Sequence, residues 1–324
     1  MIISKTPFRI SFCGGGTDLR EYYLKNQGSV VSTAMNKYMY VMVKDYFEKD
    51  KIFLKYSRTE LVKNVDRIRH PIIREALKLT GVLRGVEITS MADIPSATGL
   101  GSSSSFAVGL LNALYTHLDE YKSPKELARD ACQIEIEMLK EPIGKQDQYI
   151  AAYGGFRHIL FNQDDSVSTD IIVIPKSIKE ELESNLMLFY TGITRKASDI
   201  LSEQKKNTKK KTEFLDRMKE LSFELRESLL RKDITKFGEL LHKNWLYKKQ
   251  LASRITNPMI EKNYSLALKS GALGGKILGA GGGGFLLLYC EQGRQNAVMK
   301  SLISLRHVPF KLENHGTRIV YKDD

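Results

Sequence analysis

Four consecutive serines, at residues 102–105, follow the sequence Gly-Leu-Gly and precede an apolar stretch with helical spacing. Gly99 and Gly101 allow backbone turns that a Cβ would block, so we expect the serines in a loop and in the first helical turn. A helix start presents free N–H groups and the positive end of the helix dipole, which suit phosphate. Serine hydroxyls there could also contact phosphate oxygens or a hydrated cation. An ordinary capped helix start, which needs no ligand, is the alternative.

Two known phosphate-binding patterns do not describe this loop. No Gly-Lys-Ser/Thr follows it, as a Walker A loop requires, and the third glycine of a dinucleotide fingerprint is absent. Four serines nevertheless exceed what helix capping requires. We therefore favour phosphate binding, although the loop alone does not decide it.

A carboxylate later in the chain occupies an unexpected position. Residues 124–140 predict a helix that begins with a capping box and a proline. Glu135 falls on the same helical face as Ala128 and Ala131. A buried carboxylate is costly unless it is paired or binds a cation. We interpret Glu135 as a metal ligand, with a glutamate that reaches water from the edge of the apolar stripe as the alternative.

A second carboxylate, Asp147, lies in the polar sequence Gly-Lys-Gln-Asp-Gln at the start of the next predicted helix. It could act as a general base beside Lys145. It could also be an ordinary acidic residue that interacts with the helix dipole.

Two further segments are rich in glycine. Residues 14–16 are glycines that follow an alternating strand, and Thr17 and Asp18 come next. Both a turn with Asp18 as a helix cap and a ligand site fit this sequence. Residues 274–284 precede a strand rather than a helix, so they do not fit a dinucleotide-binding loop. Their glycine content predicts close approach of the backbone to another loop or to a ligand.

The net charge of +12 suits either nucleic acid or a small anionic substrate. Much of the excess comes from residues 205–211, a lysine-rich run that we interpret as solvated surface. Because no nucleic-acid motif accompanies it, we expect no nucleic-acid partner. Arg195 and Lys196 follow a glycine turn after a predicted strand and are a candidate anion site, although exposed cations are common on any surface.

Targeting and redox features are few. The start of the chain shows no signal-peptide pattern, and its apolar runs are too short to span a membrane. The three cysteines lie far apart without a CxxC pair, which argues against a disulfide framework or a zinc site. We expect a cytoplasmic protein with no membrane partner.

The predicted elements indicate an α+β protein with two domains. Strands near residues 8–12, 29–47, 52–56 and 86–91 suggest a mostly antiparallel sheet with helices. A hinge is expected within residues 162–183. After it, strands at residues 186–190, 285–290, 308–312 and 317–321 combine with helices in a ferredoxin-like arrangement.

Three segments now stand in order: PFRISFCGGGTD, PSATGLGSSSS and GGKILGAGGGGF. Together they resemble the three motifs of the GHMP kinases, with a Glu–Asp pair between the second and the third. The resemblance implies residues 1–170 as an N-terminal domain with a left-handed βαβ crossover, and residues 171–324 as a ferredoxin-like C-terminal domain. It also implies ATP and Mg²⁺ as cofactors.

The resemblance assigns roles to individual residues. Ser103 and Glu135 match Mg²⁺ ligands, and Asp147 matches an aspartate proposed as a base in the galactokinase branch. We predict that Lys145 stabilises charge on the moving phosphoryl group. The residues predicted to bind ATP are Pro95, Gly99, Leu100, Gly101, Ser102, Ser103 and Ser104. The residues predicted to bind the acceptor are Arg9, Gly15, Gly16, Thr17, Asp18, Arg195, Lys196, Gly281 and Gly282.

One departure bears on the acceptor. The galactokinase branch carries Glu-His before Thr-Asp, whereas this chain has Gly15 and Gly16, which leaves room for a bulkier sugar. Within the family, GGGTD, GKQDQY and YTGITRKASDIL look most like kinases that phosphorylate the anomeric hydroxyl of heptose 7-phosphate on the route to bacterial surface glycans. By charge alone, Arg195 and Lys196 are candidates for the existing phosphate, and Arg9 and Lys145 are further candidates.

Two alternatives remain at this point. A fucose- or galactose-type kinase would act on a neutral sugar, and an inactive sensor of the same fold would be expected to lack Glu135 or Asp147. The sequence leaves the oligomeric state open, a homodimer being one alternative.

Overall fold

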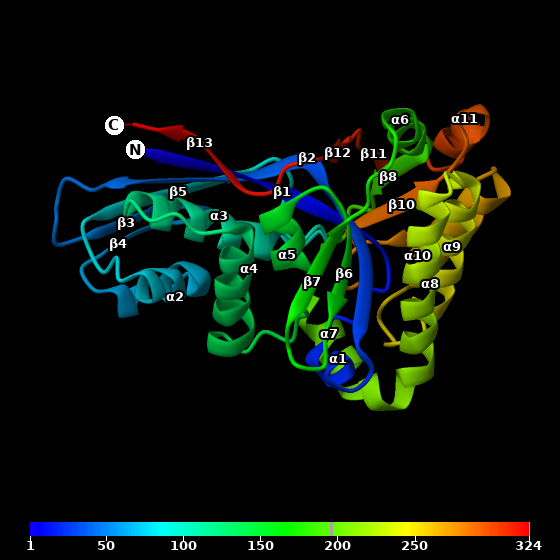
Figure 1. Cartoon of the computed structure of the whole chain (residues 1–324). Helices are drawn as coiled ribbons and strands as arrows, with labels where there is room; N and C mark the ends of the chain where they lie inside the picture. The colour runs from blue at the N-terminus through cyan, green and yellow to red at the C-terminus, as the bar shows by residue number, and fades with distance from the viewer. Residues whose placement is uncertain (195–196, 324) are drawn as a thin grey trace.

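The computed structural model describes residues 1–194 and 197–323. Figure 1 shows a sheet that holds both termini, and beside it a second, smaller sheet covered by long helices. The larger sheet has nine strands in the order β13-β1-β2-β5-β3-β4, with β6 and β12 paired to β2 and β7 paired to β6. Its strands are β1 (Ile2–Cys13), β2 (Gly28–Asp45), β3 (Ile52–Lys55), β4 (Thr59–Val62), β5 (Val86–Ala92), β6 (Phe156–Phe161), β7 (Val167–Ile171), β12 (Leu312–Glu313) and β13 (Arg318–Lys322).

Strands β1 and β2 run through the larger sheet from end to end. The first part of β2 pairs with β6 and its last part pairs with β5, while β1 pairs along nearly all of it. Both faces of β1 are covered. The alternating polar residues Arg9 and Ser11 are therefore buried, each with 4% of its surface exposed.

Helices cover the larger sheet and carry the carboxylates singled out above. Helix α3 packs on β1 and β2, and α5 packs on α3 and α4. The predicted helix at residues 124–140 divides into α4 and a π-helix that carries Glu135, a feature that often occurs at functional sites. The helices of this part are α1 (Arg20–Asn26), η1 (Val65–Arg67), α2 (Pro71–Thr80), α3 (Ser102–His117), α4 (Pro124–Cys132), the π-helix η2 (Gln133–Met138) and α5 (Gln146–Tyr153).

The smaller sheet has the antiparallel order β11-β8-β10-β9. In chain order this is 4-1-3-2, the ferredoxin-like arrangement, so the expected two-domain α+β fold is confirmed. Its strands are β8 (Leu186–Tyr190), β9 (Gly274–Ile277), β10 (Phe285–Tyr289) and β11 (Arg306–His307). The helices are α6 (Lys176–Asn185), α7 (Ala197–Asn207), η3 (Thr208–Lys211), α8 (Thr212–Leu230), α9 (Ile234–Lys248), α10 (Pro258–Lys269) and α11 (Gln292–Ser301).

The last strand differs from the sequence-based prediction. Residues 317–321 were expected to complete the smaller sheet, but β13 pairs with β1 instead, with Ile2 opposite Lys322. The nearby β12 pairs with β2. The two chain ends therefore lie side by side at one edge of the larger sheet (Figure 1). The alternation of apolar residues that identified the strand carries no information about its partner.

The two parts share one hydrophobic cluster at their junction. Phe12 of β1 stacks on Phe156 of β6, with ring centroids 5.3 Å apart, and meets Phe237 of α9 edge-on at 5.0 Å. This packing fixes β1 and α9 relative to each other. The three cysteines are free and buried. Within the described ranges, none of the helices is sufficiently long and apolar to cross a membrane.

Candidate active site

A cleft of about 990 Å³ lies where the two parts meet. Three loops line it: the first glycine loop (residues 13–18), the serine loop (95–105) and the last glycine loop (278–284). The π-helix, the start of α5, the start of α7 and the end of α9 also line it, together with residues 56–57, 70–72 and 90–94. Segments that are far apart in the sequence thus meet around one space.

The serine loop turns sharply into helix α3. Gly99 and Gly101 adopt φ values of +82° and +73°, a conformation that favours glycine, and the helix begins at Ser102. Strand β1 holds the loop, since the Arg9 N–H donates to the Leu100 carbonyl at 3.1 Å and the Arg9 guanidinium donates to the Gly99 carbonyl at 2.6 Å. The first turn of α3 lines the cleft, where its free N–H groups are available to an anion.

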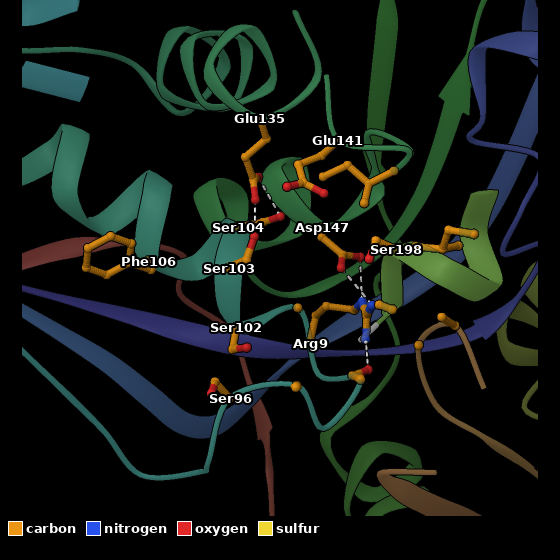
Figure 2. A pocket seen from close by; sticks show the side chains of 18 of the residues that line it. Arg9, Ser96, Ser102, Ser103, Ser104, Phe106, Glu135, Glu141, Asp147 and Ser198 are labelled. Carbon is orange, nitrogen blue, oxygen red and sulfur yellow. Dashed lines mark hydrogen bonds and ion pairs between the residues drawn. The ribbon is translucent and has the colours of Figure 1, made fainter. Parts of the chain in front are cut away.

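Glu135 faces the serine loop although it is only 1% exposed (Figure 2). Its carboxylate accepts hydrogen bonds from the Ser103 hydroxyl, from the Ser104 hydroxyl at 2.8 Å and from the Gln148 amide at 2.6 Å. Burial raises the pKa of Glu135 to about 7, and the three hydrogen bonds act in the opposite direction. The side chain that the sequence placed on an apolar stripe is therefore buried and held by polar partners.

The donors at this position fit magnesium. Mg²⁺ in proteins is commonly held by one or two carboxylates together with water and the phosphates of a substrate. Ser103 and Glu135 offer a hydroxyl and a carboxylate, they contact each other, and both line the cleft. Within residues 1–194 and 197–323, no group of three His, Cys, Asp or Glu side chains could hold a metal ion. A metal here would thus depend on the bound nucleotide for further ligands.

Asp147 and Arg9 form a two-pronged ion pair in the same cleft. The guanidinium of Arg9 donates to both carboxylate oxygens of Asp147, at 2.6 Å and 2.7 Å (Figure 2). A Cβ built on Gly101 would lie 3.1 Å from the nearer Asp147 oxygen, so the carboxylate sits directly beside the serine loop. Paired hydrogen bonds of this kind are stronger than neutral ones, and they also fix the orientation of a carboxylate.

The first glycine loop is organised by Asp18. Its carboxylate accepts hydrogen bonds from the N–H of Gly16 at 2.8 Å and from the N–H of Gln146 at 3.3 Å, which ties the loop to the start of α5. Burial is the main cause that raises the pKa of Asp18. Thr17 points away from the cleft, and its hydroxyl donates to the carbonyls of Gly14 and Ser29 at 2.8 Å and 3.0 Å.

Lys145 is not placed as its predicted role requires. Its amine lies 2.7 Å from a carboxylate oxygen of Asp165 and 5.1 Å from the ring centroid of Tyr23. It does not belong to the lining of the cleft. The arrangement gives this lysine a structural partner instead of access to a moving phosphoryl group.

One end of the cleft is aromatic. His70 meets Tyr56 edge-on, with ring centroids 4.9 Å apart, and lies 5.0 Å from the ring of Phe106. Burial lowers the pKa of His70, which favours the neutral imidazole. Met91, also in the lining, is 66% exposed. This aromatic end (Tyr56, His70, Phe106 and Met91) offers flat apolar surface to a planar ring.

Most of the predicted site residues line the cleft, and the structure brings them together. They are Arg9, Gly15, Gly16, Asp18, Pro95, Gly99, Gly101, Ser102, Ser103, Ser104, Glu135, Asp147 and Gly281. Leu100, Thr17, Gly282 and Lys145 are not in the lining. Gly282 is held elsewhere, since its N–H donates to the Ile255 carbonyl at 2.7 Å. Arg195 and Lys196 lie outside the described residues.

Several polar residues of the cleft were missed by the sequence analysis, among them Ser11, Gln204 and Lys248. Lys248 follows Leu241 and Trp245 on the buried stripe of α9, so the spacing argument used for Glu135 would have identified it. Ser11 and Gln204 carry no comparable sequence signal.

Comparison with known proteins agrees with this arrangement. The family model for the GHMP kinases N terminal domain matches residues 53–155, and the model for the GHMP kinases C terminal region matches residues 225–305. A D-glycero-alpha-D-manno-heptose 7-phosphate kinase from Campylobacter jejuni is 31% identical over 315 residues, with 93% of each chain covered. An L-fucokinase/L-fucose-1-P guanylyltransferase from Bacteroides fragilis is 27% identical, over 90% of this chain and 35% of its own length. The crystal structure of a D-glycero-D-manno-heptose 1-phosphate kinase from Bacteroides thetaiotaomicron shares the fold, with a TM-score of 0.83, 24% identity and 100% of both chains covered.

Proposed function

This chain belongs to the GHMP kinase family, and we propose that it transfers phosphate from ATP to the anomeric hydroxyl of D-glycero-D-manno-heptose 7-phosphate, giving the 1,7-bisphosphate. That it is an ATP-dependent phosphotransferase acting on a sugar hydroxyl follows from the family and from the kinase relatives. The heptose phosphate as acceptor and the anomeric position are our proposal. The similarity to the Campylobacter jejuni enzyme along nearly its whole length supports them.

One observation carries the proposal: the serine loop and the carboxylate of Asp147 lie next to each other in one cleft. Phosphoryl transfer depends mostly on positioning and on stabilisation of charge. A loop that holds the donor phosphate beside a group that orients the acceptor hydroxyl supplies both.

At the nucleotide end, defined by the serine loop, Glu135 and the aromatic end, we propose that the adenine base lies against Tyr56, His70 and Phe106. The N–H groups of the serine loop and of the first turn of α3 then hold the ATP phosphates. Ser103 and Glu135 would hold Mg²⁺, which neutralises phosphate charge when it is bound.

At the acceptor end, defined by the first glycine loop, Arg9, Asp147 and Lys248, we propose that Asp147 accepts the proton of the anomeric hydroxyl. The hydroxyl oxygen forms a bond to the terminal phosphorus of ATP while the bond between that phosphorus and the bridging oxygen of ADP breaks. Arg9 holds Asp147 in orientation through both carboxylate oxygens. Asp18 fixes the first glycine loop against α5, so the sugar meets a rigid surface.

A kinase for a neutral sugar is the second candidate, favoured by the similarity to the L-fucokinase/L-fucose-1-P guanylyltransferase. Such an enzyme would use the same nucleotide end. It would need no site for a second phosphate. An inactive sensor is disfavoured because Glu135 and Asp147 are both present and both line the cleft.

The test is a coupled ADP-release assay with Mg-ATP and a panel of acceptors: heptose 7-phosphate, mannose 6-phosphate, sedoheptulose 7-phosphate, galactose, fucose and mevalonate. We expect turnover of heptose 7-phosphate with a KM well below that of the others. Turnover of fucose or galactose alone would replace the proposal by the neutral-sugar alternative. Absence of turnover with every acceptor would favour the sensor.

A further inference from the structure

A sugar that already carries a phosphate brings a dianion into the cleft beside ATP. This inference rests on the proposed function, because only a phosphorylated acceptor requires a second anion site. Among residues 1–194 and 197–323, the Lys and Arg side chains that line the cleft are those of Arg9 and Lys248. The two side chains differ in whether a carboxylate of the protein already balances their positive charge.

The charge of Arg9 is neutralised within the protein. Its guanidinium contacts both oxygens of Asp147 and the carbonyl of Gly99. Two of its five N–H donors remain, but its positive charge is already balanced by the Asp147 carboxylate. Arg9 is therefore poorly suited to hold a second phosphate.

Lys248 has no such partner. It is 5% exposed, and its amine donates to the Gly279 carbonyl at 2.5 Å. Among the described residues no carboxylate oxygen lies within 4.0 Å of it. An ammonium group has three donors, so two remain for a ligand. Burial lowers the pKa of Lys248 to about 8, which leaves the amine charged at neutral pH.

Two buried donors beside the first glycine loop also lack partners. Gln204 of α7 is 2% exposed, and its amide nitrogen has no hydrogen-bond partner. The hydroxyl of Ser11, on β1, is likewise unpartnered, with the residue 4% exposed. Buried polar groups are normally hydrogen-bonded, and an unpartnered one needs an explanation. Both residues line the cleft.

Glycines bring these donors together. A Cβ on Gly16 would overlap the amide of Gln204, and one on Gly15 would lie 3.3 Å from the Ser11 hydroxyl. The same Cβ on Gly16 would lie 3.5 Å from Leu251, which comes three residues after Lys248 in the turn that follows α9. The first glycine loop thus leaves space between β1, α7 and the end of α9.

We propose that Lys248, Gln204 and Ser11, grouped around Gly15 and Gly16, form the subsite for the phosphate that the sugar substrate already carries. An ammonium, an amide N–H₂ and a hydroxyl match the three acceptor oxygens of a phosphate monoester. None of these three residues belongs to the serine loop or to the π-helix that carries Glu135. With its existing phosphate held in this subsite, the sugar lies across the cleft with its anomeric hydroxyl at Asp147.

The test compares Lys248→Met with Lys249→Met. Lys249 is the next residue, but its amine pairs with Glu261 at 3.0 Å and it does not line the cleft. With heptose 7-phosphate, Lys248→Met should raise the KM for the sugar about 10- to 100-fold, since a charged hydrogen-bond partner is lost. The KM for ATP should change by less than about threefold in both variants. Gln204→Leu should raise the sugar KM by a smaller factor, about 3- to 10-fold.

The possible outcomes distinguish failure of the phosphate subsite from failure of the proposed function. If the wild type uses heptose 7-phosphate and Lys248→Met keeps the same sugar KM, the proposed function stands and the subsite is refuted. A fall in kcat with an unchanged sugar KM also refutes it, because Lys248 would then act on the transferred phosphoryl group. If the wild type uses only neutral sugars, the function and the subsite both fail. Thermal melting checks folding, and the Gln204→Leu arm decides the matter if Lys248→Met does not fold.

Discussion

The nucleotide end and the acceptor end of the cleft satisfy their polar groups in different ways. At the nucleotide end, the buried carboxylate of Glu135 accepts three hydrogen bonds from Ser103, Ser104 and Gln148. At the acceptor end, Lys248 has only a carbonyl partner, and the Ser11 hydroxyl and the Gln204 amide have none. Buried donors without partners are costly, which supports our proposal that a ligand binds at this end.

The ends also differ in how the chain builds them. Ser103 and Ser104 lie in the first turn of α3 and Glu135 lies in the π-helix, with only α4 between these two segments in the chain. The acceptor end joins β1, α7 and α9, which lie far apart in the chain. The nucleotide end is built within the first part of the chain, whereas the acceptor end also needs α7 and α9 of the second part.

The largest effect is expected for Asp147→Asn, which tests the point where the two ends meet. The amide keeps the shape of the side chain but cannot accept the proton of the anomeric hydroxyl. We expect kcat to fall by about 10² or more, the usual contribution of a general base. Steady-state kinetics with heptose 7-phosphate would measure it. A loss of only a few-fold would mean that orientation of the hydroxyl suffices.

The next largest effect is expected for Gly279→Ala, because the added methyl group would push the last glycine loop away from the serine loop. Gly279 has φ +67°, and a Cβ on it would lie 2.5 Å from the Cα of Gly99. We expect kcat/KM to fall about 10- to 100-fold, through misplacement of the serine loop. Gly293→Ala is the matched control, since a Cβ there meets nothing within 4 Å. Equal activity of the two variants would contradict the contact.

A smaller effect is expected when the KM values for sugar and for ATP are measured as a function of pH. The amine of Lys248 is charged below its pKa of about 8 and loses its charge as the pH rises above that value. The sugar KM should therefore increase up to about 10-fold from pH 7 to pH 9, while the ATP KM changes less. The charged neighbours of Lys248 are Arg9, Asp18, Asp147 and Lys276. In Lys248→Met, the sugar KM should no longer increase with pH. If it increases as in the wild type, another group causes the increase.

The smallest effect is expected for Lys145→Met. Its amine pairs with Asp165, a residue that is partly exposed, and such pairs contribute at most about 1 kcal/mol. We expect kcat to change by less than about fivefold with an unchanged sugar KM. A loss of 100-fold in kcat would restore the role that the sequence suggested for Lys145.

The sequence was most informative where function resides in contiguous residues. The serine loop, Glu135 and Asp147 could be found because glycine, helical spacing and a buried carboxylate each have a local signature. The same spacing argument, applied to α9, would have found Lys248. The pairing of Lys145 with Asp165 could not be predicted, because the fold brings these two residues together.

Other features depended on long-range packing and could not be predicted. The pairing of β13 with β1 joins the two ends of the chain, and no local pattern specifies it. The placement of Ser11 and Gln204 beside the first glycine loop depends on how α7 and β1 meet. The sequence therefore predicted the fold class and the nucleotide end better than the acceptor end.

The most direct test of the central claim is the ³¹P NMR spectrum of the product made from ATP and heptose 7-phosphate. We predict one new phosphomonoester signal that couples to the anomeric proton, together with ADP and an unchanged signal from the phosphate at C7. A second pair of diphosphate doublets, in addition to those of ADP, with loss of the C7 phosphate signal would mean that the existing phosphate is the acceptor, and inorganic phosphate alone would mean hydrolysis. Either result would contradict transfer to the anomeric hydroxyl.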